Sequence, residues 1–210
     1  MNGQCKITLG SVLSEGLGIG VKNALSIVAA TVLWMLTIWI PYLNVGTTIA
    51  MTTIPIELSK GQIISPLFIF DAKYRQYMGE YFTLIGLMLI ALIPAFLFMI
   101  VPGIIIGIGW SLALYILLDK GVAPGEALVR SNKATYGYKW TIFFVGAILY
   151  VVYWIGMTVF SLIPFIGIVL IVVLWLVYIV AQMGCSAVIY RELVADEPEG
   201  QTETEERMEE

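Results

Sequence analysis

The residue types that carry most catalytic and metal-binding chemistry are scarce in this chain. Its 210 residues include no histidine and two cysteines, so histidine acid–base catalysis and the common histidine metal ligands are excluded. The sequence has no Gly-x-Ser-x-Gly, P-loop or paired-cysteine motif. The run Gly16-x-Gly18-x-Gly20 lies in a predicted helix with no strand before it, so it is not a dinucleotide-binding fingerprint. We therefore expect no catalytic residue, no metal site and no cofactor.

Two amide side chains fall inside apolar stretches and are candidate polar intramembrane residues: Gln182 and Asn44. Gln182 is the clearer candidate, because its amide needs a hydrogen-bond partner on another helix or a water molecule. Serine and threonine hydroxyls in the same stretches can bond to carbonyls of their own helix. No Asp, Glu, Lys or Arg lies well inside a predicted membrane span, which argues against proton-coupled transport.

Small residues recur at helical spacing in one apolar stretch: Gly103, Gly107 and Ser111. Residues four apart share one face of a helix, so this stripe lets another backbone approach closely. We expect a helix-packing role for the three residues, and a substrate groove is the alternative.

Five basic residues between the apolar stretches are candidate contacts for anionic lipid headgroups: Lys73, Arg75, Arg130, Lys133 and Lys139. A lysine or arginine near an anionic membrane surface contributes about 1 kcal/mol of binding free energy. The alternative is that these residues only set the orientation of the protein in the membrane, and the two roles are compatible.

Composition places the chain among membrane proteins. Hydrophobic residues make up 60% and charged residues 12% of the chain, and the mean hydropathy is +0.92. Residues 23–56, 81–118 and 140–190 contain no Asp, Glu, Lys or Arg. In hydrocarbon every backbone donor and acceptor needs an internal partner, which leaves helices or a closed barrel. Runs such as Ile104-Ile105-Ile106 do not alternate as barrel strands do, so we predict an all-α membrane protein.

Each charge-free window is long enough for two membrane-spanning helices joined by a Pro/Gly turn. The turns are centred on Pro41, Pro102 and Pro164. Six spans follow, at about residues 23–43, 45–59, 81–101, 103–118, 140–162 and 165–190. The second is only about 21 Å of helix and contains Pro55, so whether it crosses the bilayer or is re-entrant is left open.

A charged segment that reads as an amphipathic helix precedes each hairpin, at about residues 10–23, 65–77 and 124–138. In the second segment Asp71 and Arg75 are spaced as a helical ion pair. Such helices lie in the membrane interface with the apolar side down. The alternative is a helix that packs on the bundle.

The chain also shows weak internal repetition. Lys60-Gly61 recurs as Lys120-Gly121, and the three Pro/Gly turns have a similar spacing. A fixed period suggests tandem units, here residues 1–61, 62–122 and 123–193. Chance similarity of short apolar turns is the alternative.

Charge predicts how the helices are oriented. With six spans, all charged segments up to residue 193 share one face of the membrane, and their excess of Lys and Arg marks that face as cytoplasmic. Both termini are then cytoplasmic. Residues 196–210 hold eight acidic residues and one arginine. We expect a membrane domain at 1–193 and a disordered acidic tail at 194–210.

One set of motif residues resembles a known family. The set comprises Pro102, Gly103, Asp119, Glu126, Ser131, Gly137 and Tyr190. With these residues, and best from about residue 60 to 193, the chain resembles the prokaryotic YciC-like integral membrane proteins and the membrane domain attached to some glycerophosphodiester phosphodiesterases. The resemblance implies a multi-helix protein of the prokaryotic plasma (inner) membrane, mostly of unassigned function. Catalytic residues of those phosphodiesterases belong to a separate soluble barrel, so none is carried over.

These observations predict a non-enzymatic polytopic integral membrane protein that interacts with lipids or acts as an accessory membrane component. The alternative is a transporter or channel-like subunit for a small solute, with its path lined by the last three spans. Membrane lipids are the expected partners. A protein partner or a homo-oligomer is left open, and no nucleic acid is expected.

Overall fold

The computed structural model describes residues 7–62, 64–163 and 165–195, and every regular element in these ranges is helical. The predicted all-α fold is confirmed. The disordered tail predicted from residue 194 falls largely on residues 196–210, which lie outside the described residues. The helices are α1 (Leu9–Lys22), α2 (Ala24–Thr37), α3 (Pro41–Thr52), α4 (Ile54–Ser59), α5 (Met78–Phe98), α6 (Ile100–Gly109), α7 (Ala113–Lys120), α8 (Pro124–Ala134), α9 (Lys139–Ser161) and α10 (Ile166–Tyr190), with 3₁₀ segments η1 (Pro66–Phe70) and η2 (Ala72–Tyr77) and a π-helical end η3 (Arg191–Ala195).

Four helical stretches in the described part are long and apolar enough to cross a membrane. They are Ala72–Phe98, Ile100–Lys120, Lys139–Ser161 and Ile166–Val194. Large apolar side chains cover their outer surfaces: Phe98 is 87% exposed and Ile168 is 71% exposed. A water-soluble protein rarely exposes apolar patches of this extent, whereas lipid is a suitable solvent for them. The helices α1 and α2 pass the same length test only together, and they meet at a bend of 71°.

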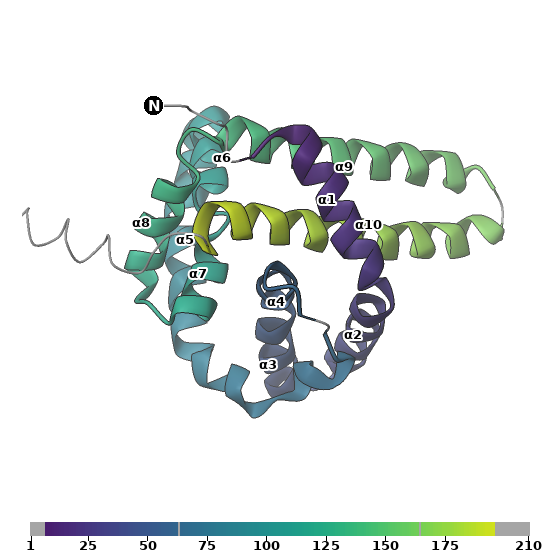
Figure 1. The fold of residues 1–210 in the computed structure, drawn as a ribbon, viewed down its shortest axis with the longest axis horizontal. Coiled ribbons are helices and arrows are strands. Elements are labelled where there is room, and N and C mark those ends of the chain that lie inside the picture. Colours follow the sequence, from purple (N-terminus) through teal and green to yellow (C-terminus); the bar gives the residue numbers. More distant parts are fainter. Residues whose placement is uncertain (1–6, 63, 164, 196–210) are drawn as a thin grey trace, which may run out of the picture.

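The second and third hairpins have antiparallel contacts. A Cβ added at Gly103 of α6 would lie 2.7 Å from the Phe96 ring of α5, and one at Gly107 would lie 3.9 Å from Leu92. On α9 and α10, the rings of Tyr153 and Tyr178 lie 5.0 Å apart. Figure 1 shows α9 and α10 side by side, with the ends next to their turn extending beyond the other helices.

The turn of the second hairpin lies at Met99 rather than at Pro102. Met99 is extended, with φ −153° and ψ 116°, and α6 begins at Ile100. Pro102 and Gly103 therefore stand inside the first turn of α6. Proline is tolerated there because the first N–H groups of a helix have no intrahelical acceptor.

The first hairpin, α2 and α3, is shorter than predicted. Trp34 Nε1 donates to Thr48 Oγ1 at 2.9 Å, and the Thr37 and Thr47 hydroxyls lie 2.8 Å apart. The two helices have 14 and 12 residues, or roughly 21 and 18 Å of length, against about 30 Å of hydrocarbon. Thr53 separates α3 from α4, where Pro55 stands in the first turn. Neither helix alone is long enough to cross a bilayer.

The first charged segment forms the predicted helix, but it packs closely against α10 instead of lying alone at an interface. A Cβ added at Gly184 would lie 2.1 Å from the Gly16 carbonyl oxygen, and one at Gly20 would lie 2.6 Å from the Val180 carbonyl oxygen. Figure 1 shows α1 crossing over α10. Glycines four residues apart permit this approach, so the Gly16 run is a packing motif.

The second charged segment is not the single amphipathic α-helix that was predicted. Asp71 is extended (φ −61°, ψ 129°) and separates η1 from η2. Its carboxylate accepts from Lys73 N at 3.0 Å, which caps η2. The predicted partner, Arg75, lies over the Tyr42 ring at 6.0 Å. The charged segment therefore contacts the turn end of the first hairpin, which was predicted to lie on the opposite face.

The third charged segment is helical over Pro124–Ala134, shorter than the predicted 124–138. Gly137 has φ +86°. This left-handed conformation suits glycine and turns the chain from α8 into α9.

The core is built around the C-terminal half of α10. Its buried residues are Val180, Ala181, Gly184, Cys185, Ala187, Val188, Ile189 and Tyr190. Val12 of α1, Ile116 and Leu117 of α7 and Leu84 of α5 are buried in the same cluster as Tyr190. Polar groups held by this part of α10 are therefore fixed in position.

Candidate functional site

Asp119 joins the ends of α4, α7 and α10. Lys60 Nζ pairs with its Oδ1, and the Tyr190 hydroxyl donates to its Oδ2 at 2.6 Å. The Asp119 side chain is 10% exposed, and Tyr190 is completely buried. Two of the motif residues, 71 positions apart, thus meet directly. Both carboxylate oxygens have a partner, so the arrangement is suited to holding three helix ends together rather than to acid–base chemistry.

The repeated Lys-Gly pairs end two of these helices in the same way. Gly61 follows α4 with φ +71°, and Gly121 follows α7 with φ +64°. Left-handed glycine is a common helix ending because it carries no Cβ. Lys60, at the end of α4, therefore reaches Asp119, near the end of α7.

Ser131 attaches α8 to the break between α6 and α7. Its hydroxyl donates to the Gly109 carbonyl at 2.7 Å and accepts from Leu112 N at 3.2 Å. The Thr135 hydroxyl donates to the Ser131 carbonyl at 2.9 Å. Ser131 and Thr135 are both fully buried. Helix breaks leave backbone groups without partners, and Ser131 satisfies one donor and one acceptor at this break.

Of the small residues in the predicted stripe, Gly103 makes the closest contact between α6 and α5. Gly103 faces the Phe96 ring, whereas Gly107 meets only Leu92, at ordinary van der Waals distance. Ser111 lies beyond the end of α6, is exposed and donates to the Ile108 carbonyl at 2.8 Å. The predicted stripe thus divides into a packed residue, a loosely packed residue and an exposed residue.

Three of the five candidate lipid-contacting residues have partners within the protein. Lys73 Nζ lies 3.7 Å from Asp71 Oδ2, and Arg130 pairs with the motif residue Glu126 one helical turn away. Arg75 lies beside Tyr42. These contacts leave Lys133 and Lys139 as the stronger candidates.

Lys133 and Lys139 flank the turn from α8 to α9. Lys133 is exposed, and Lys139 Nζ donates to the neutral Asn132 Oδ1 at 2.9 Å. Tyr136 and Trp140, at the same turn, are 79% and 73% exposed. We call Lys133, Tyr136, Lys139 and Trp140 the α8–α9 corner. It combines basic and amphipathic aromatic side chains at the start of an apolar helix.

The two candidate intramembrane amides lie in different surroundings. Asn44 Nδ2 donates to Thr37 Oγ1 at 3.4 Å, within the first hairpin. Gln182 lines a pocket of about 360 Å³. The lining residues are Thr31, Trp34, Thr48, Met51, Thr52, Pro55, Tyr115, Trp175, Ile179, Gln182, Met183 and Ser186. No local sequence pattern predicts this set, because its residues come from five helices.

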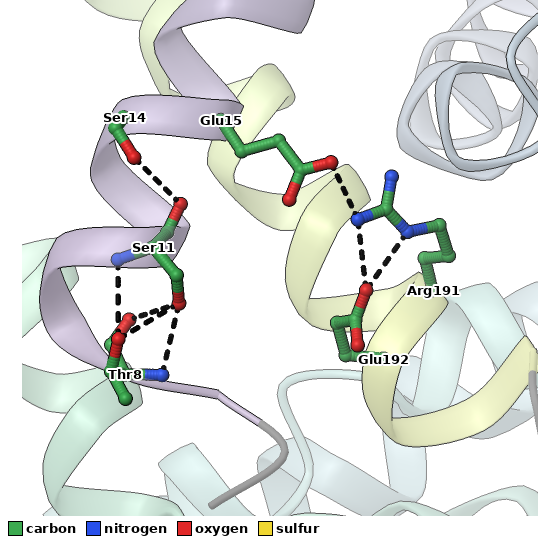
Figure 2. A network of polar contacts seen from close by, with 6 residues as sticks. All are labelled: Thr8, Ser11, Ser14, Glu15, Arg191 and Glu192. Carbon is green, nitrogen blue, oxygen red and sulfur yellow. Dashed lines mark hydrogen bonds and ion pairs between the residues drawn. The ribbon is translucent and has the colours of Figure 1, made fainter.

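A further polar network connects α1 with the end of α10 (Figure 2). Arg191 donates to Glu15 Oε1 at 2.7 Å and to Glu192 Oε1 at 2.8 Å. At the start of α1, the Thr8 and Ser11 side chains form a capping box. Figure 2 shows the arginine between the two carboxylates. The Glu15–Arg191 ion pair therefore links α1 to the end of α10, next to the close contact between Gly16 and Gly184.

The described residues contain no group of three or more His, Cys, Asp or Glu side chains placed to hold a metal ion. The described residues offer three distinct features: the Asp119 cluster, the α8–α9 corner and the pocket beside Gln182. Comparison of the chain with family models, curated proteins and solved structures finds no match.

Proposed function

We propose that this protein is a non-enzymatic integral membrane protein that binds anionic lipid headgroups at the α8–α9 corner. The supporting observation is that Lys133, in the last turn of α8, and Lys139, the first residue of the apolar helix α9, flank two exposed aromatic residues or lie next to them. Basic side chains attract anionic headgroups. Tyrosine and tryptophan rings prefer the boundary between hydrocarbon and water. The two preferences place the corner at the headgroup level.

Placing the α8–α9 corner at the headgroup level also determines how the helices would lie in the membrane. The hairpin α5–α6, continued by α7, and the hairpin α9–α10 would cross the bilayer, with their turns on the face opposite the corner. The first hairpin, with helices of 14 and 12 residues, would enter the bilayer without crossing it. The positive charge of the corner makes its face cytoplasmic. The family resemblance supports the plasma membrane of a prokaryote as the location.

Replacing both Lys133 and Lys139 with glutamine is expected to weaken the binding of phosphatidylglycerol by roughly 30-fold. Each lysine contributes about 1 kcal/mol at an anionic surface, and 2 kcal/mol corresponds to about that factor. The binding is measured by titrating the lipid onto the detergent-solubilised protein and counting bound lipids by native mass spectrometry. Phosphatidylcholine, which has no net charge, should bind both proteins equally.

The matched control is the double variant Lys73→Gln and Arg130→Gln, which removes the same amount of charge. Both of these residues already have an acidic partner, so their loss should change the affinity less than threefold. If the two double variants lost the same affinity, binding would depend on total charge and not on the corner. That result would contradict the proposal.

A further inference from the structure

The pocket beside Gln182 lies among helices distant in sequence. Its walls come from α2, α3, α4, α7 and α10, and none of its lining residues belongs to α8 or α9. Its volume of about 360 Å³ falls at the lower end of the range for ligand pockets, about 300–1,000 Å³. This volume suits roughly a dozen non-hydrogen atoms, at about 30 Å³ each. The pocket is independent of the α8–α9 corner.

Gln182 lies inside the candidate membrane span Ile166–Val194. Arg191 lies nine positions further along the helix, or about 13 Å away. Arg191 belongs to the ionic network at the end of α10, which marks the polar boundary. With the boundary there, a hydrocarbon core of about 30 Å would surround Gln182, and the pocket would open to lipid rather than to bulk water.

The polar groups around the pocket differ in how they are satisfied. Trp34 Nε1 donates to Thr48 Oγ1 at 2.9 Å, and Thr52 donates to its own helix at Ile49 O. Within the part of the chain that the structure describes, the Gln182 amide has no hydrogen-bond partner. An amide in an apolar environment requires such a partner. A ligand in the pocket can provide one.

The charge of the lining restricts the ligand. None of the twelve lining residues is charged, so a charged ligand would lose its hydration without gaining a counter-charge. Trp34, Trp175 and Ile179 supply an apolar surface. Met51 and Met183 are flexible side chains that adapt to different ligand shapes. The lining thus suits a neutral molecule with an apolar body and a hydrogen-bonding group.

We infer that this pocket binds an uncharged single-chain amphiphile taken from the bilayer. Its hydroxyl or ester carbonyl bonds to the Gln182 amide, and its hydrocarbon packs against Trp34 and Trp175. The ligand enters from the side, through the exposed surface around Gln182. This binding requires no charge on the ligand and no contribution from the α8–α9 corner.

The test uses the full-length protein in detergent, titrated with monodecanoylglycerol and followed by native mass spectrometry. This ester is larger than the pocket, so the glycerol head and the first carbons of the chain would occupy it and the rest of the chain would stay in the surrounding detergent. We expect one bound molecule per chain and about tenfold weaker binding to Gln182→Leu, because one hydrogen bond is lost. Ile179→Trp, which adds volume to the lining, is expected to abolish binding. Decanoic acid and decyltrimethylammonium, which have the same chain length and opposite charges, should bind at least tenfold more weakly than the glycerol ester.

The control variant is Thr158→Val on α9, outside the pocket. Its hydroxyl donates only to Trp154 O of the same helix, at 2.9 Å, so binding should be unchanged. Elution as one symmetric peak confirms that each variant is folded. The inference is overturned if Gln182→Leu and Ile179→Trp both bind as well as the unmodified chain, if a charged probe binds as tightly as the ester, or if no probe binds. None of these outcomes would alter the result expected for Lys133 and Lys139.

Discussion

Gly184→Ala is expected to destabilise the protein by about 3 kcal/mol, although it adds a single methyl group. The added Cβ would lie 2.1 Å from the Gly16 carbonyl oxygen and 2.9 Å from the Gly20 amide nitrogen. Both are backbone atoms, which cannot rotate away as a side chain can. Helix α1 would have to move off α10, and the Glu15–Arg191 ion pair would be lost with it. Thermal unfolding in detergent, followed by intrinsic fluorescence, measures the effect.

Gly18→Ala is the matched control for this prediction. Gly18 lies on α1 between the two packed glycines, but a Cβ there meets no atom within 4 Å. Alanine favours helix over glycine by about 0.5–1 kcal/mol, so this substitution should leave the melting temperature unchanged or raise it. The two variants are thus expected to shift the melting temperature in opposite directions. Equal shifts would mean that α1 does not cross α10 at Gly184.

Asp119→Ala is expected to destabilise the protein by about 3 kcal/mol. The substitution leaves the hydroxyl of the buried Tyr190 without its acceptor at 2.6 Å, and a hydrogen bond to a charged group contributes about 1.5–3 kcal/mol. Lys60 adds less, because its side chain is 42% exposed and solvent screens the pair. Tyr190→Phe, which keeps the ring, should produce most of the same loss. Urea or thermal unfolding in detergent measures both.

The control for Asp119 is Glu126→Ala. Glu126 also forms an ion pair, but with Arg130 on the same helix, where the two side chains are 41% and 36% exposed. Such helical pairs contribute about 0.3–0.5 kcal/mol. Asp119→Ala should therefore be several-fold more destabilising than Glu126→Ala. Equal effects would show that the Asp119 cluster is solvated like a surface pair.

The last hairpin was predicted well from the sequence. The predicted spans 140–162 and 165–190 lie within one residue of α9 (Lys139–Ser161) and α10 (Ile166–Tyr190). Lys139 and Arg191 bound this window, and it contains no charge. Charge limits and apolar length are local properties, so a single sequence is sufficient to locate such helices.

The N-terminal third was predicted less well, for two physical reasons. Glu15 and Lys22 suggested an interfacial helix, but the glycines of α1 and Gly184 permit a backbone contact that outweighs amphipathicity. Around Asp71, the carboxylate bonds to a nearby backbone N–H, which competes with a continuous α-helix. The spacing of the glycines in α1 is a sequence signal for close helix packing. No comparable signal marks the break between η1 and η2 at Asp71.

Long-range pairs within the candidate site could not be read from one sequence. The motif residues Asp119 and Tyr190 were identified separately, but their contact spans 71 positions and depends on how α7 and α10 pack. Gln182 was identified because an amide is unusual in an apolar helix. Its neighbours in the pocket come from four other helices, and no local pattern links them.

The layout of the hairpins is tested most directly by labelling single cysteines with a membrane-impermeant maleimide. Met99 and Phe165 lie at the two hairpin turns and are 65% and 92% exposed, and Lys133 lies at the corner. After Cys5 and Cys185 are replaced with alanine, each of these three positions is changed to cysteine in turn. We predict that Met99→Cys and Phe165→Cys react in intact cells, whereas Lys133→Cys reacts only after permeabilisation. Reaction of all three from the same compartment would contradict the crossing of the bilayer by these two hairpins.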